Sequence, residues 1–166
     1  MLFLIIALWI FIETPFGQNW ITRQVTKRFS KELQTKISIR HVDLSLFNRM
    51  HLEGLMVEDR SGDTLLYAGD LQVRITDWFF FKKKAELKYI GLENALIKFQ
   101  RKDSVWNNQF LFDYFSSNDT SKSSKKGGIE FNLKKVSLKN VAFVKKDAWI
   151  GDDMIGYIRR LRLDAD

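Results

Sequence analysis

The chain has no cysteine, a single proline and only two histidines among its 166 residues. The lack of cysteine excludes disulfide scaffolds, thiolate metal centres and thiol nucleophiles. The two histidines, His41 and His51, are too few for a metal cluster made of histidines alone. The sequence also contains no glycine-rich phosphate loop and no nucleophile elbow. These absences argue against an enzyme.

The composition is that of a folded protein, with 45% hydrophobic and 28% charged residues. The net charge is +7, from 27 Lys and Arg against 20 Asp and Glu. Residues 79–84 place three phenylalanines before three lysines, a pattern that can stack on bases, lie at a bilayer interface or end a strand. Positive charge alone does not identify a nucleic-acid partner. Because an apolar segment begins the chain, we favour a membrane over nucleic acid.

Residues 1–12 carry no polar side chain. At 1.5 Å per residue this run spans only roughly 18 Å, whereas a membrane-spanning helix needs about 20 residues. We interpret residues 1–14 as the end of a membrane anchor whose beginning is missing; a signal-peptide remnant and a buried core helix are the alternatives. The proposed anchor residues are Leu2, Phe3, Leu4, Ile5, Ile6, Leu8, Trp9, Ile10, Phe11 and Ile12.

A second helix is predicted over residues 18–34, after the break at Thr14-Pro15. Its apolar residues Ile21, Val25, Phe29 and Leu33 recur every four positions, which is one helical stripe. This amphipathic helix can cap the following domain with that stripe, or it can lie on an anionic bilayer. The membrane-surface candidates are Trp20, Arg23, Lys27, Arg28 and Lys31.

Alternating apolar residues predict that residues 36–166 are mainly β-strands, with one buried face. Residues 116–128 contain no apolar side chain and are predicted to be a flexible loop. The last residues read as a strand without its partner, so we interpret the domain as incomplete at its C-terminus and the chain as a fragment of a longer protein.

One pattern recurs along these strands, with apolar residues at a position, three residues later and two residues after that. It begins at Ile39, Leu87, Leu133 and Ile158, and weaker copies begin at Leu52 and Ala68. The copies at Leu87 and Leu133 extend over about a dozen residues. A step of three followed by a step of two fits a strand whose bulge or kink resets which side chains face the core. Repeats of this kind favour an open, stacked β-structure.

The N-terminal half of the chain resembles the AsmA-like proteins, and in particular their TamB-like (translocation and assembly module) branch. The resemblance rests on the apolar helix, Pro15-Phe16, Gln18-Asn19 and the basic amphipathic helix. It continues through Lys36-Ile37-Ser38-Ile39, Val42-Asp43-Leu44, Leu52-Glu53-Gly54-Leu55, Val57-Glu58-Asp59 and Gly62-Asp63-Thr64-Leu65-Leu66-Tyr67-Ala68. It extends to about Ile75; beyond that point it rests on the style of the repeat.

The resemblance implies a single-pass inner-membrane protein with its body in the periplasm. It implies an open antiparallel sheet folded into an apolar trough, a β-taco, that takes part in phospholipid transport to the outer membrane and in outer-membrane biogenesis. It implies no catalytic residue, metal or cofactor. The implied partners are the inner membrane, phospholipid acyl chains and an outer-membrane assembly protein.

We expect nine apolar residues of the repeats to line this trough. They are Ile39, Val42, Leu44, Leu87, Ile90, Leu92, Leu133, Val136 and Leu138. The alternative is that these side chains form a closed core, since buried apolar residues usually serve packing. A second functional reading is a tethered scaffold that binds an assembly partner through its sheet edge and carries no lipid.

Overall fold

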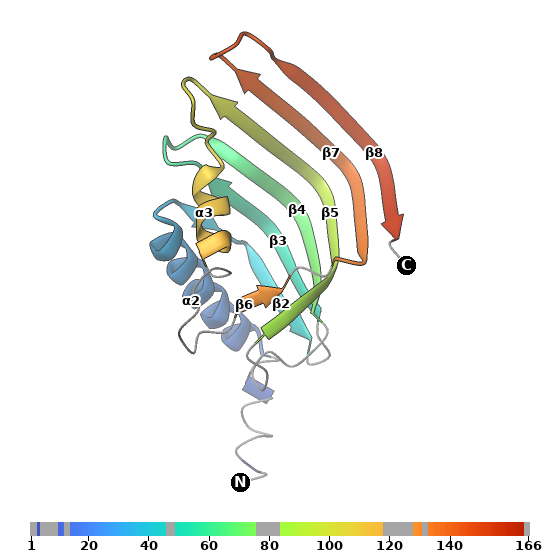
Figure 1. Ribbon diagram of the computed structural model, residues 1–166. Helices are drawn as coiled ribbons and strands as arrows, with labels where there is room; N and C mark the ends of the chain where they lie inside the picture. The colour runs from blue at the N-terminus through green and yellow to red at the C-terminus, as the bar shows by residue number, and fades with distance from the viewer. Residues whose placement is uncertain are drawn as a thin grey trace.

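The computed structural model describes residues 3, 10–11, 14–45, 49–75, 84–117, 128–130 and 133–164. In chain order the elements are α2 (Pro15–Leu33), β1 (Ile37–Ser38), β2 (His41–Ser45), β3 (Arg49–Glu58), β4 (Thr64–Ile75), β5 (Lys84–Arg101), α3 (Gln109–Ser117), β6 (Gly128–Glu130), β7 (Lys135–Asp147) and β8 (Met154–Asp164). The strands form one open sheet in the order β1-β3-β4-β5-β7-β8, with β2 on β3 and β6 on β5. The long strands bend together, and α2 and α3 lie on the inner side of the bend (Figure 1). The prediction of a mainly β chain with an unclosed sheet is therefore confirmed.

The sheet is mixed, so the prediction of a purely antiparallel sheet was wrong. The neighbours β5 and β7 run parallel, as do β5 and β6. Parallel neighbours need a crossover connection that brings the chain back to the end of the sheet at which the first strand began. Here α3 lies on the connection between β5 and β7. The parallel pairing puts Leu92 opposite Leu138 and keeps an offset of 46 residues, which is the spacing between the two extended repeats. The repeat therefore encodes the register of this pair.

The helix α2 begins at Pro15, three residues before the predicted start, because Thr14 caps it. The Thr14 hydroxyl accepts a hydrogen bond from the Gly17 amide at 3.1 Å, and proline is favoured in the first helical turn. The helix contacts β1 and β2, and Leu33 enters the core. Of its predicted apolar stripe only Leu33 is buried, while Ile21 and Val25 are half-buried and Phe29 is 39% exposed.

The short helix α3 begins at Gln109 and packs on the core. Phe110 is buried, and Leu111 and Tyr114 pack against the same core as Leu33. The helix includes Ser116 and Ser117, and Gly128 begins β6, so the predicted loop of residues 116–128 is too long at both ends. The remainder of that loop lies outside the described residues.

The predicted membrane anchor lies mostly outside the described residues. Of residues 1–14, the structure describes Phe3, Ile10, Phe11 and Thr14. Within the described part of the chain, no helix is long and apolar enough to span a bilayer.

A row of kinked residues crosses the sheet at one level of the strands. Gly54, Asn94 and Asn140 have positive φ angles of 61°, 53° and 53°. Gly69 on β4 and Arg159 on β8 lie at the same level of the sheet. These five residues have no partner in the strand pairing, so that Glu53 pairs with Asp70 and Leu55 with Ala68 on either side of the gap. The Asn140 side chain donates a hydrogen bond to the Asn94 side chain at 3.1 Å, which links two of the kinks.

The kinks explain the step of three in the copies of the pattern that begin at Leu52, Ala68 and Ile158. In the copies that begin at Ile39, Leu87 and Leu133, the step of three comes before the level of the kinks and contains no residue of positive φ. On β3, Leu52 and Leu55 are three residues apart and both are buried, because the left-handed residue between them resets the alternation. The predicted parity reset is confirmed here and at the equivalent steps on β4 and β8. Kinks aligned across neighbouring strands bend the whole sheet, which produces the curvature seen in Figure 1.

We expect Gly54→Ala to lower the free energy of unfolding by about 1–2 kcal/mol. An alanine at this φ angle is strained, and its Cβ would lie 3.0 Å from the Cβ of Arg40. The matched control is Gly156→Ala on β8, whose added Cβ would meet its nearest atom, the Phe143 Cβ, at 3.9 Å. Urea unfolding of both variants measures the difference, and equal losses would contradict the role of the kink.

Candidate functional site

The candidate site is the side of the sheet that carries successive rows of apolar residues, here called the inner face. One row runs Val42, Leu52, Leu71, Leu92, Leu138 and Leu161 across six strands. A second row lies two residues further along each strand, toward the lower end of the sheet in Figure 1. It runs Leu44, Met50, Val73, Ile90, Val136 and Leu163. On the far side of the kinks, a third row runs Leu55, Ala68, Ala95, Val141 and Ile158. The opposite side of the sheet is called the outer face.

Six of the nine predicted trough residues lie in the first two rows: Val42, Leu44, Ile90, Leu92, Val136 and Leu138. Ile39 lies between β1 and β2 and packs against the core, whereas Leu133 precedes β7 and is 37% exposed. Leu87 pairs with Ile75 beside a register shift of β4 against β5. The side chains of Leu44 and Leu87 are outside the described part of the structure.

Burial along the inner face changes from one edge of the sheet to the other. Near the helices, Val42 is 2% and Leu52 is 6% exposed. In the same row Leu71, Leu92 and Leu138 are half-buried, and Leu161 on β8 reaches 36%. Because the chemistry of the first row stays constant while its cover decreases, this row is closed at one edge of the sheet and open at the other. The third row differs, since Ala68, Ala95 and Val141 are 0%, 5% and 0% exposed and the inner face beyond the kinks is closed as far as β7.

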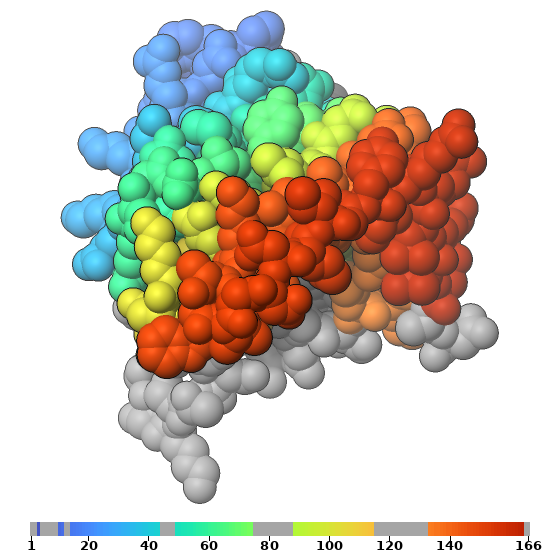
Figure 2. All heavy atoms as spheres, turned by 90° about the horizontal axis from the view of Figure 1, so that it is seen from above, coloured from blue at the N-terminus to red at the C-terminus, as the bar shows by residue number. Residues whose placement is uncertain are grey.

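The open side ends at β8, which is the last strand of the sheet. Its inner-face residues Met154 and Leu163 are 55% and 54% exposed. Seen from above, the chain runs across the molecule from blue to red and β8 forms the outer margin (Figure 2). The opposite edge, formed by β1 and β2, contacts α2. Only one of the two edges is thus covered by a helix of the described chain.

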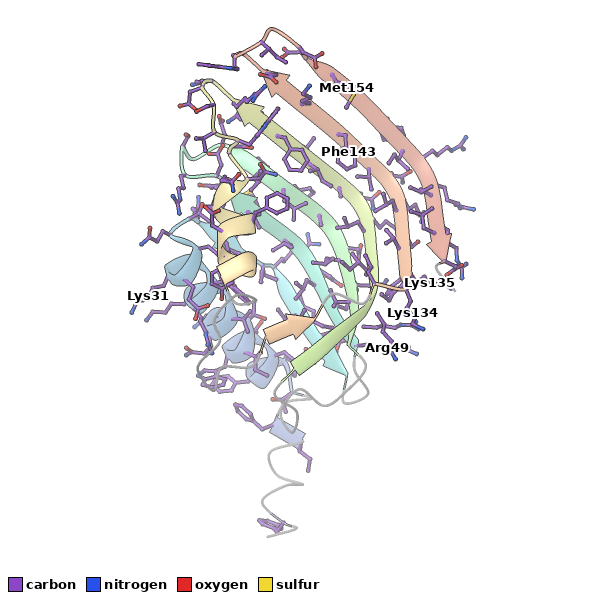
Figure 3. The ribbon with its side chains drawn as sticks, in the orientation of Figure 1. Lys31, Arg49, Lys134, Lys135, Phe143 and Met154 are labelled. Carbon is purple, nitrogen blue, oxygen red and sulfur yellow. The ribbon has the colours of Figure 1, made fainter. Side chains whose placement is uncertain are left out.

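Basic residues gather at the end of the sheet opposite the β7–β8 turn. Figure 3 shows Arg49, Lys134 and Lys135 there, with Met154 at the other end. Arg49 pairs with Arg74, whose guanidinium lies 5.2 Å from the centre of the Tyr89 ring. Lys135 pairs with Asp164 at 2.8 Å, which also lowers the pKa of that carboxyl through the hydrogen bond from Lys135. Arg49, Arg74 and Lys135 alternate along their strands with Met50, Val73 and Val136 of the second apolar row, so these basic residues lie on the outer face of the sheet.

The membrane-surface candidates on α2 lie on its solvent side. Trp20 is 52% exposed, and Arg23, Lys27, Arg28 and Lys31 are exposed. Positions 20, 23, 27 and 31 fall on one helical stripe, which also includes Phe16, 73% exposed. Arg28 instead pairs with Glu32 at 2.8 Å. The two roles considered for this helix thus use opposite faces: one packs on the sheet and the other presents aromatic and basic groups.

Two buried carboxylates hold the turns at the upper ends of the strands. Asp147 is 1% exposed and accepts two hydrogen bonds from Arg101, both at 2.7 Å. The pairing with Arg101 lowers the pKa of Asp147. The Arg101 guanidinium also lies 4.6 Å from the centre of the Trp106 ring. This network joins the end of β5 to the end of β7.

Asp59 fixes the turn between β3 and β4 in the same way. It accepts hydrogen bonds from the Ser61 and Asp63 amides at 2.9 Å, from the Gln100 side chain at 2.9 Å and from the Asn107 side chain at 3.0 Å. Burial by itself raises the pKa of Asp59, but these hydrogen bonds outweigh it and hold the pKa below its usual value.

The prediction missed the inner-face residues beyond the kinks, which include Ala95, Ile97, Val141 and Phe143. A signal for them was present, because Leu92-x-x-Ala95-x-Ile97 and Leu138-x-x-Val141-x-Phe143 repeat the same steps of three and two. In both copies an asparagine precedes the second apolar residue, at the position that adopts the left-handed conformation.

No family model, curated protein or solved structure matches the chain. The functional argument therefore depends on the geometry described above.

We expect the stability of the protein to depend on pH through Asp59. Because its pKa is lowered in the fold, Asp59 stabilises the protein above its unfolded-state pKa of about 3.9, and this contribution is lost as the pH falls through the lower folded-state value. Asp59→Asn faces the Gln100 and Asn107 donors with an amide, which should cost about 1–3 kcal/mol at neutral pH.

The measurement is chemical unfolding between pH 2 and pH 7. The variant should lose less stability than the parent chain as the pH falls below about 4. Asp113→Asn, on the exposed side of α3, serves as the control and should follow the parent curve. Parallel curves for Asp59→Asn and the parent would contradict this assignment.

Proposed function

We propose that this chain is the membrane-proximal part of a lipid conduit of the AsmA-like, TamB-like kind. In this proposal residues 1–14 belong to an inner-membrane anchor, the body lies in the periplasm, and the inner face shields phospholipid acyl chains on their way to the outer membrane. No catalytic step is involved. The supporting observation is the inner face itself, whose rows stay apolar across the sheet and whose first two rows become more exposed toward β8.

The energetics favour this use of the surface. Each methylene that leaves water contributes about 0.8 kcal/mol, so an acyl chain gains several kcal/mol by lying along half-exposed leucines. The rows present such residues on β7 and β8, where Leu161 and Leu163 are 36% and 54% exposed.

A second candidate is a tethered scaffold for the assembly of outer-membrane proteins. The observation that favours it is the outer edge of β8, an eleven-residue strand that pairs with β7 and with no other strand among the described residues. Such an edge can accept an added strand through backbone hydrogen bonds. The two functions differ in what touches the inner face: lipid in the first, side chains of a partner strand in the second.

We expect a photo-crosslinking residue at Val136 to capture phospholipid in cells, because Val136 faces the open part of the inner face. The matched control is the same probe at Ser137, the next residue, which faces the outer side of β7. Lipid adducts at Val136 and not at Ser137 support the conduit. Protein adducts without lipid at Val136 would favour the scaffold.

Leu138→Asp tests whether the site is open. A charge in a closed core should unfold the domain at a cost of several kcal/mol, whereas a half-exposed charge reaches solvent. Since Leu138 is half-buried, we expect the variant to fold with reduced stability and to lose the lipid adduct at Val136. Ser137→Asp is the control and should retain both properties. Complete unfolding of Leu138→Asp would indicate a closed core.

The proposed topology is tested with reporters fused after Gln34, at the end of α2. A reporter that functions only outside the cytoplasm should be active, because the body is proposed to lie in the periplasm. A reporter that functions only in the cytoplasm, fused at the same residue, is the control. Activity of that second reporter would overturn the proposed location.

A further inference from the structure

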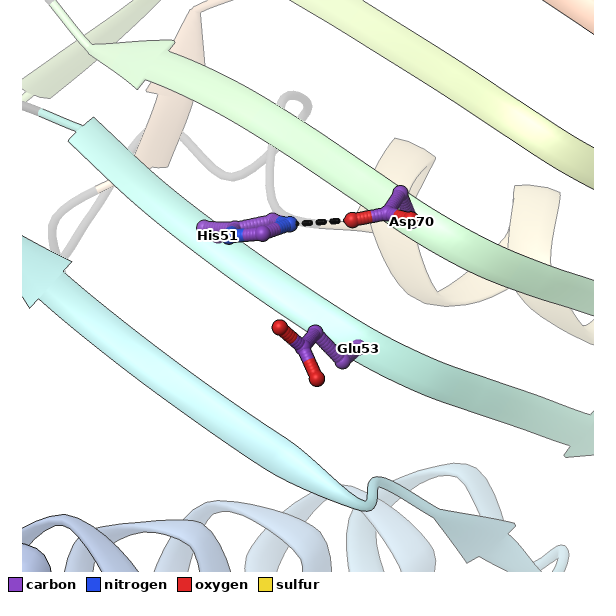
Figure 4. Close-up of side chains that lie close together, drawn as sticks. All are labelled: His51, Glu53 and Asp70. Carbon is purple, nitrogen blue, oxygen red and sulfur yellow. Dashed lines mark hydrogen bonds and ion pairs between the residues drawn. The ribbon is translucent and has the colours of Figure 1, made fainter.

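The outer face of the sheet carries a cluster of groups that the lipid conduit does not use. His51 and Glu53 are two residues apart on β3 and therefore point to the same side, opposite to Leu52. Asp70 on β4 pairs directly with Glu53 in the sheet register. One ligand atom from each of these three side chains lies within 4.8 Å of the others. Figure 4 shows the His51 ring directed at Asp70, with the Glu53 carboxylate beside them.

We propose that His51, Glu53 and Asp70 bind a divalent transition-metal ion, for which Zn²⁺ is the test ion. The donors are one imidazole nitrogen and two carboxylate oxygens, a set that suits first-row divalent metals better than Ca²⁺ or Mg²⁺, which prefer oxygen alone. Metal–ligand distances of about 2.0–2.2 Å require donors about 3.5 Å apart in a tetrahedral site. Donors already within 4.8 Å reach this separation by small side-chain rotations.

The existing hydrogen bond arranges the first ligand. His51 Nε2 faces Asp70 Oδ1 at hydrogen-bond distance, so the nitrogen points at this carboxylate on the outer face of the sheet (Figure 4). Replacing the shared proton by a metal ion keeps both partners in place. His41, the other histidine, pairs directly with Glu53 in the sheet register but lies outside the three-residue cluster, so the fourth position is assigned to water in this proposal.

The charges of the surrounding row also favour a cation. Glu53, Asp70 and Glu93 lie directly opposite one another on three neighbouring strands, and like charges so placed destabilise a sheet. Lys139 pairs with Glu93 from β7, and Arg40 approaches Glu53 to 3.8 Å. A divalent ion between Glu53 and Asp70 neutralises both carboxylates at once.

The site is reachable from solvent and partly shielded from it. The side chains of His51 and Asp70 are 33% and 36% exposed, and that of Glu53 is 40% exposed. An ion can therefore enter without a change in the fold, and it lies on the side of the sheet away from the apolar rows. The inference does not depend on the proposed lipid function.

The test is a Zn²⁺ titration of the full, tag-free chain by isothermal calorimetry, together with NMR of the imidazole groups. Because the chain has only two histidines, each gives its own signals. We expect one ion per chain, with the His51 signals shifted more than those of His41, which lies opposite Glu53 on β2. His51→Gln and Asp70→Asn should each weaken binding by at least about tenfold, since even the loss of an outer partner of a metal ligand costs 10–100-fold.

The matched control is Glu58→Gln on the same strand. The Glu58 carboxylate pairs with Lys36 at 2.9 Å and does not belong to the cluster. This variant should bind Zn²⁺ as the parent does. If His51→Gln does not fold, as judged by circular dichroism, Asp70→Asn still removes a ligand at nearly constant size. No measurable binding, equal shifts of both histidines, or unchanged affinity in His51→Gln or Asp70→Asn would each overturn the proposal.

Discussion

The left-handed backbone at Gly54, Asn94 and Asn140 is the constraint on which the rest of the structure depends. An ordinary strand places every second residue on the same side, so a single kink in one strand would send the following side chains to the wrong face. Here the kinks occur at one level across the sheet, and all strands change parity together. The rows on either side of the kinks therefore remain apolar on the inner face, and the sheet gains its bend at the same place.

The bend also determines what the inner face can do. Close to β1 and β2, the helices α2 and α3 fill the concave side with Leu33 and Phe110, and the result is an ordinary core. Toward β8 no helix of the described residues covers the rows, and leucines of the same pattern become half-exposed or exposed. The same repeat thus serves folding at one edge and presents an open apolar surface at the other. On the outer face, the alternation places His51, Glu53 and Asp70 together without disturbing either role.

Much of this arrangement could be predicted from the sequence, because side-chain parity is a local property. The step of three residues from Leu52 to Leu55 indicated a kink, and the 46-residue offset between the two extended repeats matched the register of β5 and β7. The parallel direction of that pair could not be predicted, since it depends on the connection through α3. The increase in exposure from β3 to β8 could not be predicted either, because Leu52 and Leu161 have the same place in the sequence pattern and differ only in what covers them. The metal-ligand cluster was missed because Asp70 meets Glu53 only through the pairing of two strands.

The central claim is that the uncovered part of the inner face holds phospholipid. Native mass spectrometry of the chain purified from membranes in mild detergent tests it most directly, because bound lipid adds a defined mass to the intact protein. We expect phospholipid adducts on the parent chain that persist through purification and are lost in Leu138→Asp while Ser137→Asp retains them. A folded parent chain without phospholipid adducts, or with adducts equally abundant in Leu138→Asp, would contradict the claim.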